Sequence, residues 1–507
     1  MISKLKYLSL AFFIAACGSV QKASETSELY NEPHRPQIHF SPKANWMNDP
    51  NGMVYYNNKY HLFYQYYPDS TVWGPMHWGH AISKDLVHWE HRPIALYPDS
   101  LGYIFSGSAV ADVSNTSGFG KDGQVPLVAI FTHHDAKAEK AGSNTYQTQS
   151  IAYSVDDGKT WIKYANNPVL KNPGIKDFRD PKVMWFEAGK KWIMTLAVLD
   201  KIEFYSSPDL KNWTKESDFG KEFGAHGGVW ECPDLFPLKH QNNIVWILVV
   251  NINPGGPNGG SASQYFTGQF DGNKFIPYQT DTRWLDYGPD EYAGITWSNT
   301  GDRKVFFGWM SNWQYANIVP TEKWRSAMTI PRDLALEKIG EKYLITSKPA
   351  PELSVIESKP ILLEKIAATN YNLTEKTGQL TGPVRLDVTT TSLKPFTVTL
   401  SNDAGEKVLV GYDNASNSYY IDRSNSGKVS FEKGFAKRHI GPRFSTKENM
   451  DMTLIIDNAS VELFADNGLT TMTQIFFPNT PFTNIQIESQ SGLTIDTLKF
   501  TSLKSIW

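Results

Sequence analysis

The 507-residue sequence predicts an all-β protein, in which a five-bladed β-propeller is followed by a C-terminal β-sandwich. Three observations lead to this prediction. Apolar and aromatic runs recur at similar intervals, a short turn motif that ends in tryptophan is repeated, and the residue pattern changes near position 350. Repeats of this length are typical of propellers and of other arrays built from one small β-unit.

The apolar runs indicate the number of blades. They cover residues 53–66, 125–131, 183–198, 244–250 and 305–310. Their starts lie roughly 50 to 70 residues apart, and residues typical of turns separate them. Five runs therefore predict five sheets.

The repeated turn motif marks the corners of the first three sheets. It reads "SKDLVHW" at 83–89, "SVDDGKTW" at 154–161 and "SSPDLKNW" at 206–213, so each copy has Ser, then Asp, then a closing Trp. Each copy follows one of the first three runs. We interpret them as equivalent strand–turn–strand corners of successive four-stranded blades. The alternative is a β-sandwich in which these echoes arise by chance.

A second domain is expected after "PAP" at 349–351. Tryptophans nearly vanish beyond this point, and segments such as "VRLDVTTT" and "MTLIIDNASVELFADNG" alternate apolar with polar residues between turns. This period-2 alternation predicts an antiparallel sandwich. The length of the chain also favours two domains. We assign residues 33–345 to the propeller and residues 355–507 to the sandwich.

Residues 1–17 resemble a bacterial lipoprotein signal peptide. Lys4 and Lys6 precede an apolar run, residues 7–16, that is too short for a permanent bilayer anchor. The run leads into "IAAC", so we expect cleavage before Cys17 and a lipid on its thiol; a plain secretory signal is the alternative. Residues 18–32, which are rich in Ser, Glu and Lys, are then expected to form a flexible tether.

Composition narrows the class of partner. Lys and Arg number 49 and Asp and Glu number 52, a net charge of −3 that offers no basic field to nucleic acid or to an anionic membrane surface. Contact with a membrane is therefore expected only through the lipid. Aromatic residues, at 13% of the chain, suit sugar binding. Because Cys17 and Cys232 are the only cysteines, a lipidated chain has no internal disulfide and depends on packing.

Three acidic residues stand in similar short motifs. Asp49 lies in "NWMNDPNG", Asp180 in "FRDP" and Glu231 in "WECPDLF". They precede the first, third and fourth apolar runs, and the innermost strands of a propeller line its axial funnel. If the acids converge there, they can supply the two groups that glycoside hydrolysis needs. One carboxylate attacks the sugar or activates a water molecule, and one acid protonates the leaving oxygen.

The flanking residues predict the protonation states of two of these acids. The amides of Asn45 and Asn48 are expected to donate to Asp49 and to keep it ionised. The apolar letters of "WECP" around Glu231 offer little to solvate a charge, and so favour its protonated form.

We expect no metal or cofactor. The histidines of "MHWGH", His77 and His80, suggest a metal site at first sight. In a strand, however, residues three apart point to opposite faces and cannot bind one ion together.

As an ordered set, the motifs resemble glycoside hydrolase family 32, the β-fructosidases. The set comprises "WMNDPNG", "FSGS", "FRDP", "ECPDLF", "DYGPDEYA" and "GWMSNWQYAN", and it spans the chain from His39 to Leu334. Weaker echoes, "YYIDRSNSG" and "SVELFADNG", are similar to the C-terminal sandwich of that family. The resemblance implies a five-bladed propeller joined to a β-sandwich, which the repeats predict independently.

The resemblance also implies a role for each acid. Asp49 matches the nucleophile that attacks a fructosyl anomeric carbon, Glu231 matches the general acid/base, and Asp180 matches the transition-state stabiliser that holds two fructose hydroxyls. Other positions that resemble fructose-binding ones are Asn48, Gln65, Trp73, Phe105, Ser106, Arg179, Asp286 and Trp313. The family often has an aromatic residue where this chain has Glu291, which leaves the role of Glu291 open.

These implications predict a retaining hydrolase that releases fructose from the ends of levan or inulin and acts less on sucrose. An endo-levanase and a fructosyltransferase would use the same acids, whereas a sugar-binding propeller lipoprotein would have no need of all three. The enzyme is expected to be exported and lipid-anchored to a bacterial membrane, on its periplasmic or cell-surface side.

Overall fold

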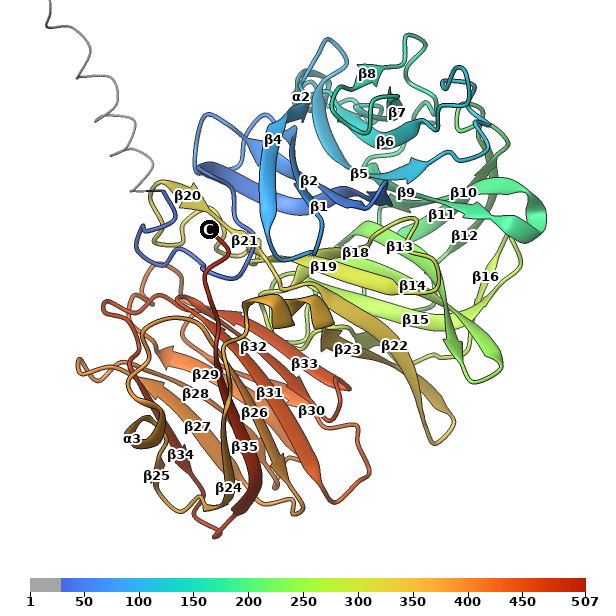
Figure 1. Cartoon of the computed structure of the whole chain (residues 1–507). Coiled ribbons are helices and arrows are strands. Elements are labelled where there is room, and N and C mark those ends of the chain that lie inside the picture. Colours follow the sequence, from blue (N-terminus) through green and yellow to red (C-terminus); the bar gives the residue numbers. More distant parts are fainter. Residues whose placement is uncertain (1–28) are drawn as a thin grey trace, which may run out of the picture.

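The computed structural model describes residues 29–507. The expected signal peptide, the lipidation site at Cys17 and most of the expected tether lie outside these residues. Figure 1 shows two β-rich parts: sheets arranged around a centre, from blue to yellow along the chain, and a stack of two sheets in orange and red. The predicted all-β fold, a propeller domain followed by a sandwich, is confirmed.

Five sheets follow one another along the first part of the chain, and all their strand pairs are antiparallel except the pair of β1 with the short β20. The first contains β1 (Asn45–Tyr56), β2 (Lys59–Tyr67), β3 (His77–Ser83) and β4 (Trp89–Leu96), with the short β20 (Trp324–Arg325) beside β1. The second contains β5 (Tyr103–Ala111), β6 (Leu127–His134), β7 (Gln147–Ser154) and β8 (Ile162–Lys163). The third contains β9 (Phe178–Phe186), β10 (Lys191–Val198), β11 (Lys201–Ser207) and β12 (Thr214–Phe219).

The last two sheets of this part have extra short strands. The fourth contains β13 (Val229–His240), β14 (Asn243–Asn253), β15 (Ala262–Phe270), β16 (Phe275–Pro277) and β17 (Arg283–Trp284). The fifth contains β18 (Tyr292–Thr296), β19 (Lys304–Met310), β21 (Ala327–Met328), β22 (Arg332–Ile339) and β23 (Lys342–Pro349). Each of the five apolar runs lies in a different sheet, as predicted. The runs at 53–66 and 183–198 span parts of the first two strands of their sheets, and the other three lie in the second strand, namely β6, β14 and β19.

The inner strands lie next to one another in chain order. β1 contacts β5, β5 contacts β9, β9 contacts β13, β13 contacts β18, and β18 contacts β1. Residues at the starts of these strands, although far apart in sequence, therefore share one region of space.

The three copies of the turn motif form equivalent corners. Each connects the third and fourth strands of its sheet. In the first copy the Ser83 hydroxyl donates to Oδ1 of Asp85, at 3.1 Å, and the same oxygen accepts from the backbone N–H of Val87. Asp156 and Asp209 accept from a serine hydroxyl and from backbone N–H groups in the same way. Asp thus satisfies turn backbone groups that have no ladder partner.

The C-terminal part consists of two six-stranded sheets. One contains, in spatial order, β24 (Ile361–Ala367), β35 (Thr494–Ser502), β26 (Val384–Thr390), β31 (Met450–Asp457), β32 (Ser460–Ala465) and β33 (Thr470–Ile475). The other contains β25 (Tyr371–Asn372), β34 (Asn484–Glu488), β27 (Phe396–Ser401), β28 (Lys407–Asp413), β29 (Ser418–Asn425) and β30 (Arg438–Pro442).

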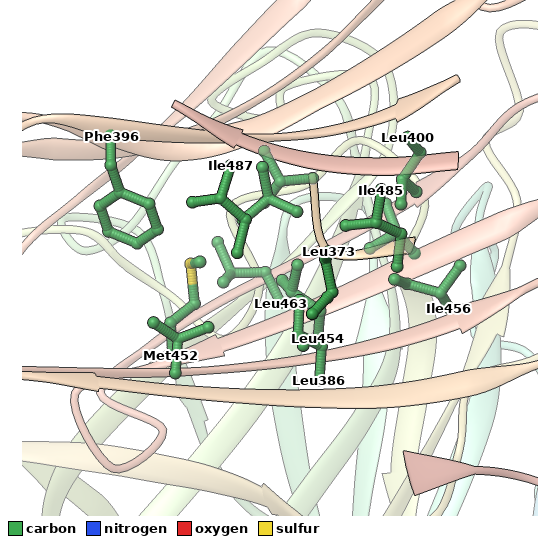
Figure 2. Packing of buried hydrophobic residues seen from close by; sticks show 14 of the residues in the cluster. Leu373, Leu386, Phe396, Leu400, Met452, Leu454, Ile456, Leu463, Ile485 and Ile487 are labelled. Atoms are coloured by element: carbon green, nitrogen blue, oxygen red, sulfur yellow. The ribbon is translucent and has the colours of Figure 1, made fainter. Parts of the chain in front are cut away.

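Alternate residues of these strands fill the space between the two sheets. Figure 2 shows Phe396 and Leu400 of β27 on one side of this core and Met452 and Leu454 of β31 on the other. All four are at most 2% exposed, so the period-2 pattern read from the sequence is the pattern of burial.

A buried ionic network joins the two parts. Arg332 of β22 donates through Nε to Oε2 of Glu462 on β32, at 3.0 Å, and through Nη1 to Oδ2 of Asp286, at 3.0 Å. Nε2 of His39 lies 2.9 Å from Oε1 of Glu462. These charges are compensated by one another, so removing one partner would leave an unpaired charge in the interior.

The ends of the described chain lie close together, as the C label beside the blue segment in Figure 1 indicates. The ring of Tyr30 stacks on Trp507, with centroids 3.9 Å apart, and Glu32 forms an ion pair with Arg35 at 2.7 Å. Residues 29–32, which the sequence assigned to the flexible tether, are therefore held against the folded part. Aromatic stacking and ion pairing override a composition typical of a linker.

Helices are short in the part of the chain that the structure describes. They are α2 (Ala136–Lys140), α3 (Thr374–Thr377) and the 3₁₀ turns η1 (Glu187–Gly189) and η2 (Pro351–Ile356). Among residues 29–507, no helix has the length and apolar character needed to cross a bilayer.

Candidate active site

Asp49, Asp180 and Glu231 line one cavity. They lie near the starts of β1, β9 and β13, the first strands of the first, third and fourth sheets. The cavity has a volume of about 260 Å³. The other lining residues are Asn48, Gln65, Trp73, Phe105, Ser106, His134, Glu139, Tyr146, Gln147, Asp177, Arg179 and Trp313.

Bulges in the strands place the three acids. The register of the β-ladder shifts between Met47 and Pro50, opposite Asp180-Pro181, and between Glu231 and Asp234. Each motif has a proline in or beside its bulge. Because the bulge interrupts the ladder, the N–H that proline lacks is not needed for a ladder hydrogen bond there. The backbone of Asp180 has φ 64°, a left-handed conformation that turns the chain locally. The motifs "NDP", "RDP" and "ECP" therefore encode a break in the ladder as well as an acid.

Two neighbouring side chains orient Asp49. Nδ2 of Asn48 donates to Oδ1 at 2.9 Å, and the Ser106 hydroxyl donates to Oδ2 at 2.6 Å. The Asn48 amide is itself fixed, because its Oδ1 accepts from the indole of Trp46 at 2.7 Å. The expected contact from Asn45 is absent: its amide donates to the carbonyl of Pro68 instead.

Asp49 lies in a poorly solvated position. Burial raises the pKa of Asp49 above its ordinary value; the Ser106 hydrogen bond acts in the opposite direction, and the charge of Glu231 adds to the rise. The carboxyl keeps the two donors described above, which stabilise its ionised form.

Asp180 is held by the backbone of the neighbouring sheet. The N–H of Cys232 donates to Oδ2 of Asp180 at 3.1 Å, and the N–H of Asp180 donates to the Thr132 hydroxyl at 3.0 Å. Burial raises the pKa of Asp180 to about 7; Arg179 opposes the rise, and the charges of Glu231 and Asp49 add to it. The site therefore retains a proton near neutral pH.

Glu231 is surrounded by donors, which differs from the apolar environment that the sequence predicted. Nε and Nη2 of Arg179 donate to Oε1 at 3.1 and 2.9 Å, and the Tyr292 hydroxyl donates to Oε2. The indole of Trp230 lies elsewhere and donates to the carbonyl of Ala225. Consecutive residues of a strand point to opposite faces, so sequence neighbours of Glu231 do not surround its carboxyl.

Cys232 contacts the other two acids. Its Sγ lies 3.5 Å from Oδ2 of Asp49 and 3.7 Å from Oδ2 of Asp180, and its thiol is free and buried. Burial and the charges of these carboxyls raise the pKa of Cys232 well above its ordinary value, so the thiol is a neutral donor here.

Aromatic rings form one wall of the cavity. Phe105 stacks on the imidazole of His134, with centroids 4.1 Å apart, and Trp73 meets Phe105 edge to face at 6.0 Å. Trp73 is 39% exposed, and its backbone N–H donates to Asn317, which holds the loop at the mouth. Trp313 stacks on Trp46. Flat apolar faces beside carboxyls are the surfaces that sugars use.

The structure brings all but one of the sequence-predicted site residues to this cavity. Gln65 lines it, while its amide donates to Asn51 and to the carbonyl of Ile104. Asp286 lies instead in the ionic network between the two parts, where it accepts from Arg332 and from the Thr473 hydroxyl at 2.6 Å. The motif that contains Asp286 lies in the propeller domain as expected, but the Asp286 side chain faces the sandwich.

Six residues of the site were not singled out from the sequence. Tyr292 belongs to the motif "DYGPDEYA", which is the signal that could have found it. His134, Glu139, Tyr146, Gln147 and Asp177 come from the segments around β6, α2, β7 and β9, which show no distinctive pattern. Asp177 and Gln147 both contact Nη1 of Arg179, at 2.6 and 3.5 Å, and so fix its position.

His77 and His80 do not share a site. Nδ1 of His77 bonds to the carbonyl of Pro75, whereas Nε2 of His80 lies 3.1 Å from Nδ1 of His61. Within residues 29–507 no group of three or more His, Cys, Asp or Glu side chains is arranged to hold a metal ion.

The geometry is therefore that of a carboxylate site with an arginine, a phenol and aromatic walls. A model of the glycosyl hydrolases family 32 N-terminal domain matches residues 39–349, and a model of the family 32 C-terminal domain matches residues 355–505. The chain is 42% identical to a levanase of Bacillus subtilis, with 100% of this chain and 76% of the levanase covered.

Two further comparisons agree. The chain is 43% identical to an extracellular exo-inulinase of Aspergillus awamori, over 92% of this chain and 94% of that protein. The crystal structure of exo-inulinase from the same organism superimposes with a TM-score of 0.87 and 39% identity, covering 94% of this chain and 100% of that one. With both domains matched in order over most of its length, the protein belongs to glycosyl hydrolase family 32.

Proposed function

We propose that the protein is a retaining glycosidase that removes fructose from the ends of β-fructans such as levan or inulin, with sucrose as a lesser substrate. The observation that carries this proposal is the cavity of about 260 Å³, which Asp49, Asp180 and Glu231 line together with the guanidinium of Arg179. This volume is at the low end for ligand pockets, so it suits one terminal sugar unit better than a stretch of polymer.

The first step breaks the glycosidic bond. A carboxylate oxygen of Asp49 attacks the anomeric carbon of the terminal fructosyl unit, the bond to the leaving sugar breaks, and Glu231 gives its proton to the leaving oxygen. The Asn48 and Ser106 hydrogen bonds aim Asp49, and an oriented nucleophile needs no further ordering when the substrate arrives.

The second step reverses these roles. Glu231 takes a proton from water, the resulting hydroxide equivalent attacks the anomeric carbon, and the bond to Asp49 breaks to release fructose. Glu231 must hold a proton in the first step. The proton that Glu231 takes from water in the second step is the one that it donates in the next turnover.

Asp180 and Arg179 are assigned to the sugar hydroxyls. Both line the cavity, and Arg179 is fixed by Asp177 on one side and Glu231 on the other. A preorganised pair of this kind can strengthen its hydrogen bonds to the sugar as charge develops in the transition state.

Product analysis at low conversion tests the proposal. We expect free fructose alone from levan and from inulin, and β-fructofuranose as the first anomer seen by NMR. A ladder of oligosaccharides before fructose would indicate endo cleavage, and growth of longer chains in concentrated sucrose would indicate transfer. Binding of fructan without any product would indicate a sugar-binding protein, and Asp49→Ala protein is the inactive control.

We also propose that the chain is exported and anchored through a lipid on Cys17, with the enzyme outside the cytoplasm. Support comes from the sequence of residues 1–17 and from the word "extracellular" in the names of the exo-inulinases. Cys17→Ser should move the protein from the membrane fraction to the soluble fraction; an unchanged distribution would contradict lipidation.

A further inference from the structure

Side chains, rather than a strand, cover one edge of β9, the strand that carries Arg179 and Asp180. β10 pairs with one edge of β9, and among the described residues no strand pairs with the other edge. Buried backbone N–H and C=O groups that lack a partner destabilise a fold. The groups on the free edge of β9 therefore need partners from elsewhere.

Polar side chains of the second sheet supply those partners. The N–H of Phe178 donates to Oε1 of Gln147, and the carbonyl of Phe178 accepts from Nε2 of Gln149, both at 2.8 Å. The N–H of Asp180 donates to the hydroxyl of Thr132 at 3.0 Å. Thr132 and Gln149 lie opposite each other on β6 and β7, so one ladder of the second sheet presents both side chains to β9.

Ser108, the last residue of the motif "FSGS", contacts the other side of the bulge at Asp180. Its hydroxyl donates to the carbonyl of Pro181 and accepts from the N–H of Val183, both at 3.0 Å. One hydroxyl thus satisfies an acceptor and a donor of β9 where the ladder shifts register. The side chains that hold this edge, which we call the bracket, are each at most 2% exposed: Ser108, Thr132, Gln147 and Gln149.

One arrangement of hydrogens satisfies the centre of the bracket. The Thr132 oxygen accepts from Asp180, and the Thr132 hydroxyl hydrogen is donated to Oε1 of Gln149, at 2.7 Å. Nε2 of Gln149 then remains for the carbonyl of Phe178. Removal of the Thr132 hydroxyl would therefore leave two buried groups unpaired, the Asp180 N–H and Oε1 of Gln149.

We propose that Ser108, Thr132 and Gln149 are positioning residues. By holding the bulge of β9 they aim the Asp180 carboxyl into the cavity, although none of the three lines the cavity. Asp180 has a left-handed backbone, with φ 64°, and a residue other than glycine keeps this conformation only where its surroundings hold it. This inference rests on the proposed function, in which Asp180 binds sugar hydroxyls. It adds that the second sheet sets the aim of a carboxyl on the third.

Thr132→Val tests the bracket, because valine resembles threonine in shape but cannot accept the Asp180 N–H. We expect Thr132→Val to lower kcat on inulin about tenfold or more with a smaller change in KM, because Asp180 is assigned to contacts that strengthen in the transition state. Thr132→Ser keeps the hydroxyl and should restore most of the wild-type kcat. Ser108→Ala removes the other hydroxyl at the bulge and should lower kcat in the same way.

Thr267→Val is the matched control. Thr267 is 1% exposed, and its hydroxyl donates to Oε1 of Gln279 at 2.9 Å, as the Thr132 hydroxyl does to Gln149. Thr267 lies on β15 and does not line the cavity. We expect both valine variants to melt at a lower temperature than the wild type. Only Thr132→Val should have a lower kcat at a temperature where both variants are folded.

Two further measurements connect the effect with Asp180. In an Asp180→Asn background, Thr132→Val should cause little further loss of kcat on a β-fructoside with a good leaving group, because residues that act as a unit are not additive. Hydrogen exchange of the backbone amides within residues 178–183, followed by mass spectrometry, should be faster in Thr132→Val than in the wild type. Thr132→Ser should exchange at the wild-type rate.

A wild-type kcat in folded Thr132→Val or in folded Ser108→Ala would overturn the inference. Equal losses of kcat in Thr132→Val and Thr267→Val, or unchanged amide exchange in Thr132→Val, would do the same. If Thr132→Val does not fold, the kcat of Ser108→Ala decides. A wild type without activity on any fructan would refute the proposed function instead, and amide exchange does not depend on activity, so the two failures can be told apart.

Discussion

Arg179 donates two hydrogen bonds to Oε1 of Glu231, from Nε at 3.1 Å and from Nη2 at 2.9 Å, although the two residues are 52 positions apart. The pair connects the third sheet with the fourth across the floor of the cavity. Arg179 thus contacts the carboxyl of Glu231 directly, and its neighbour Asp180 lies farther away, with 3.9 Å between Nε and Oδ2.

Loss of this pair should impair catalysis. Arg179→Gln removes the charge that balances Glu231 and Asp180, so we expect kcat/KM on inulin to fall by about 100-fold or more. Without the cation, the neighbouring carboxyls favour protonation, and the pH profile of kcat/KM should move to higher pH. Steady-state kinetics from pH 4 to pH 9 measure both effects. Arg92→Gln, in a pair with Glu90 outside the cavity, should behave as the wild type.

The two carboxyls assigned to bond cleavage should differ in their response to azide. Asp49→Ala and Glu231→Ala are each expected to lower kcat by several orders of magnitude in a folded protein. Azide should partly restore Glu231→Ala on a substrate with a good leaving group, because cleavage then needs no acid and the anion replaces water. Substantial activity in folded Asp49→Ala protein would contradict the mechanism.

Trp73 is expected to contact the leaving part of the substrate. It is exposed at the mouth and contacts Phe105, so Trp73→Ala is expected to raise KM for fructo-oligosaccharides several-fold with less effect on kcat. The comparison of KM for sucrose and for a longer oligosaccharide measures the effect. Tyr278→Ala, which changes an aromatic ring of similar exposure away from the cavity, is the control. An unchanged KM for every substrate would argue against contact with Trp73.

His39 should make stability depend on pH. Burial alone would lower its pKa, but hydrogen bonds to Asp457 and Glu462 raise the pKa of His39 to about 9. The folded state therefore binds this proton more tightly than the unfolded state, whose histidines have a pKa near 6.5. The contribution of charged His39 to the free energy of unfolding is complete below pH 6.5 and is lost as the pH rises to about 9. This contribution is up to about 3 kcal/mol.

Melting temperatures between pH 6 and pH 9.5 measure this loss. We expect His39→Gln to be less stable than the wild type at pH 6, with a difference that narrows as pH increases. His88→Gln is the control, because the His88 side chain is 51% exposed. A constant difference across this range would show that His39 is not charged in the folded state.

Much of the fold follows from local sequence. Burial of alternate strand residues and turns at fixed spacing are local properties, so the five runs, the Ser-Asp-Trp corners and the sandwich pattern could be read directly. The bulges at Asp49, Asp180 and Glu231 are also local, because a proline without an N–H marks each of them.

Contacts between distant strands could not be read in this way. The direction of a side chain depends on strand register and on what the neighbouring sheet presents to it. Asp286 was therefore expected at the cavity but faces Arg332, the amide of Asn45 bonds to Pro68 instead of Asp49, and residues 29–32 pack against Trp507.

The sequence by itself determined the β-fold, its two parts, the family and the three acids, since each depends on patterns within a few residues. Only the tertiary structure decided what surrounds those acids: Arg179 and Tyr292 on Glu231, Ser106 on Asp49, and the Cys232 backbone on Asp180. The pKa of a carboxyl depends on burial and on charges a few ångströms away. Those neighbours come from different sheets, and folding alone brings them together.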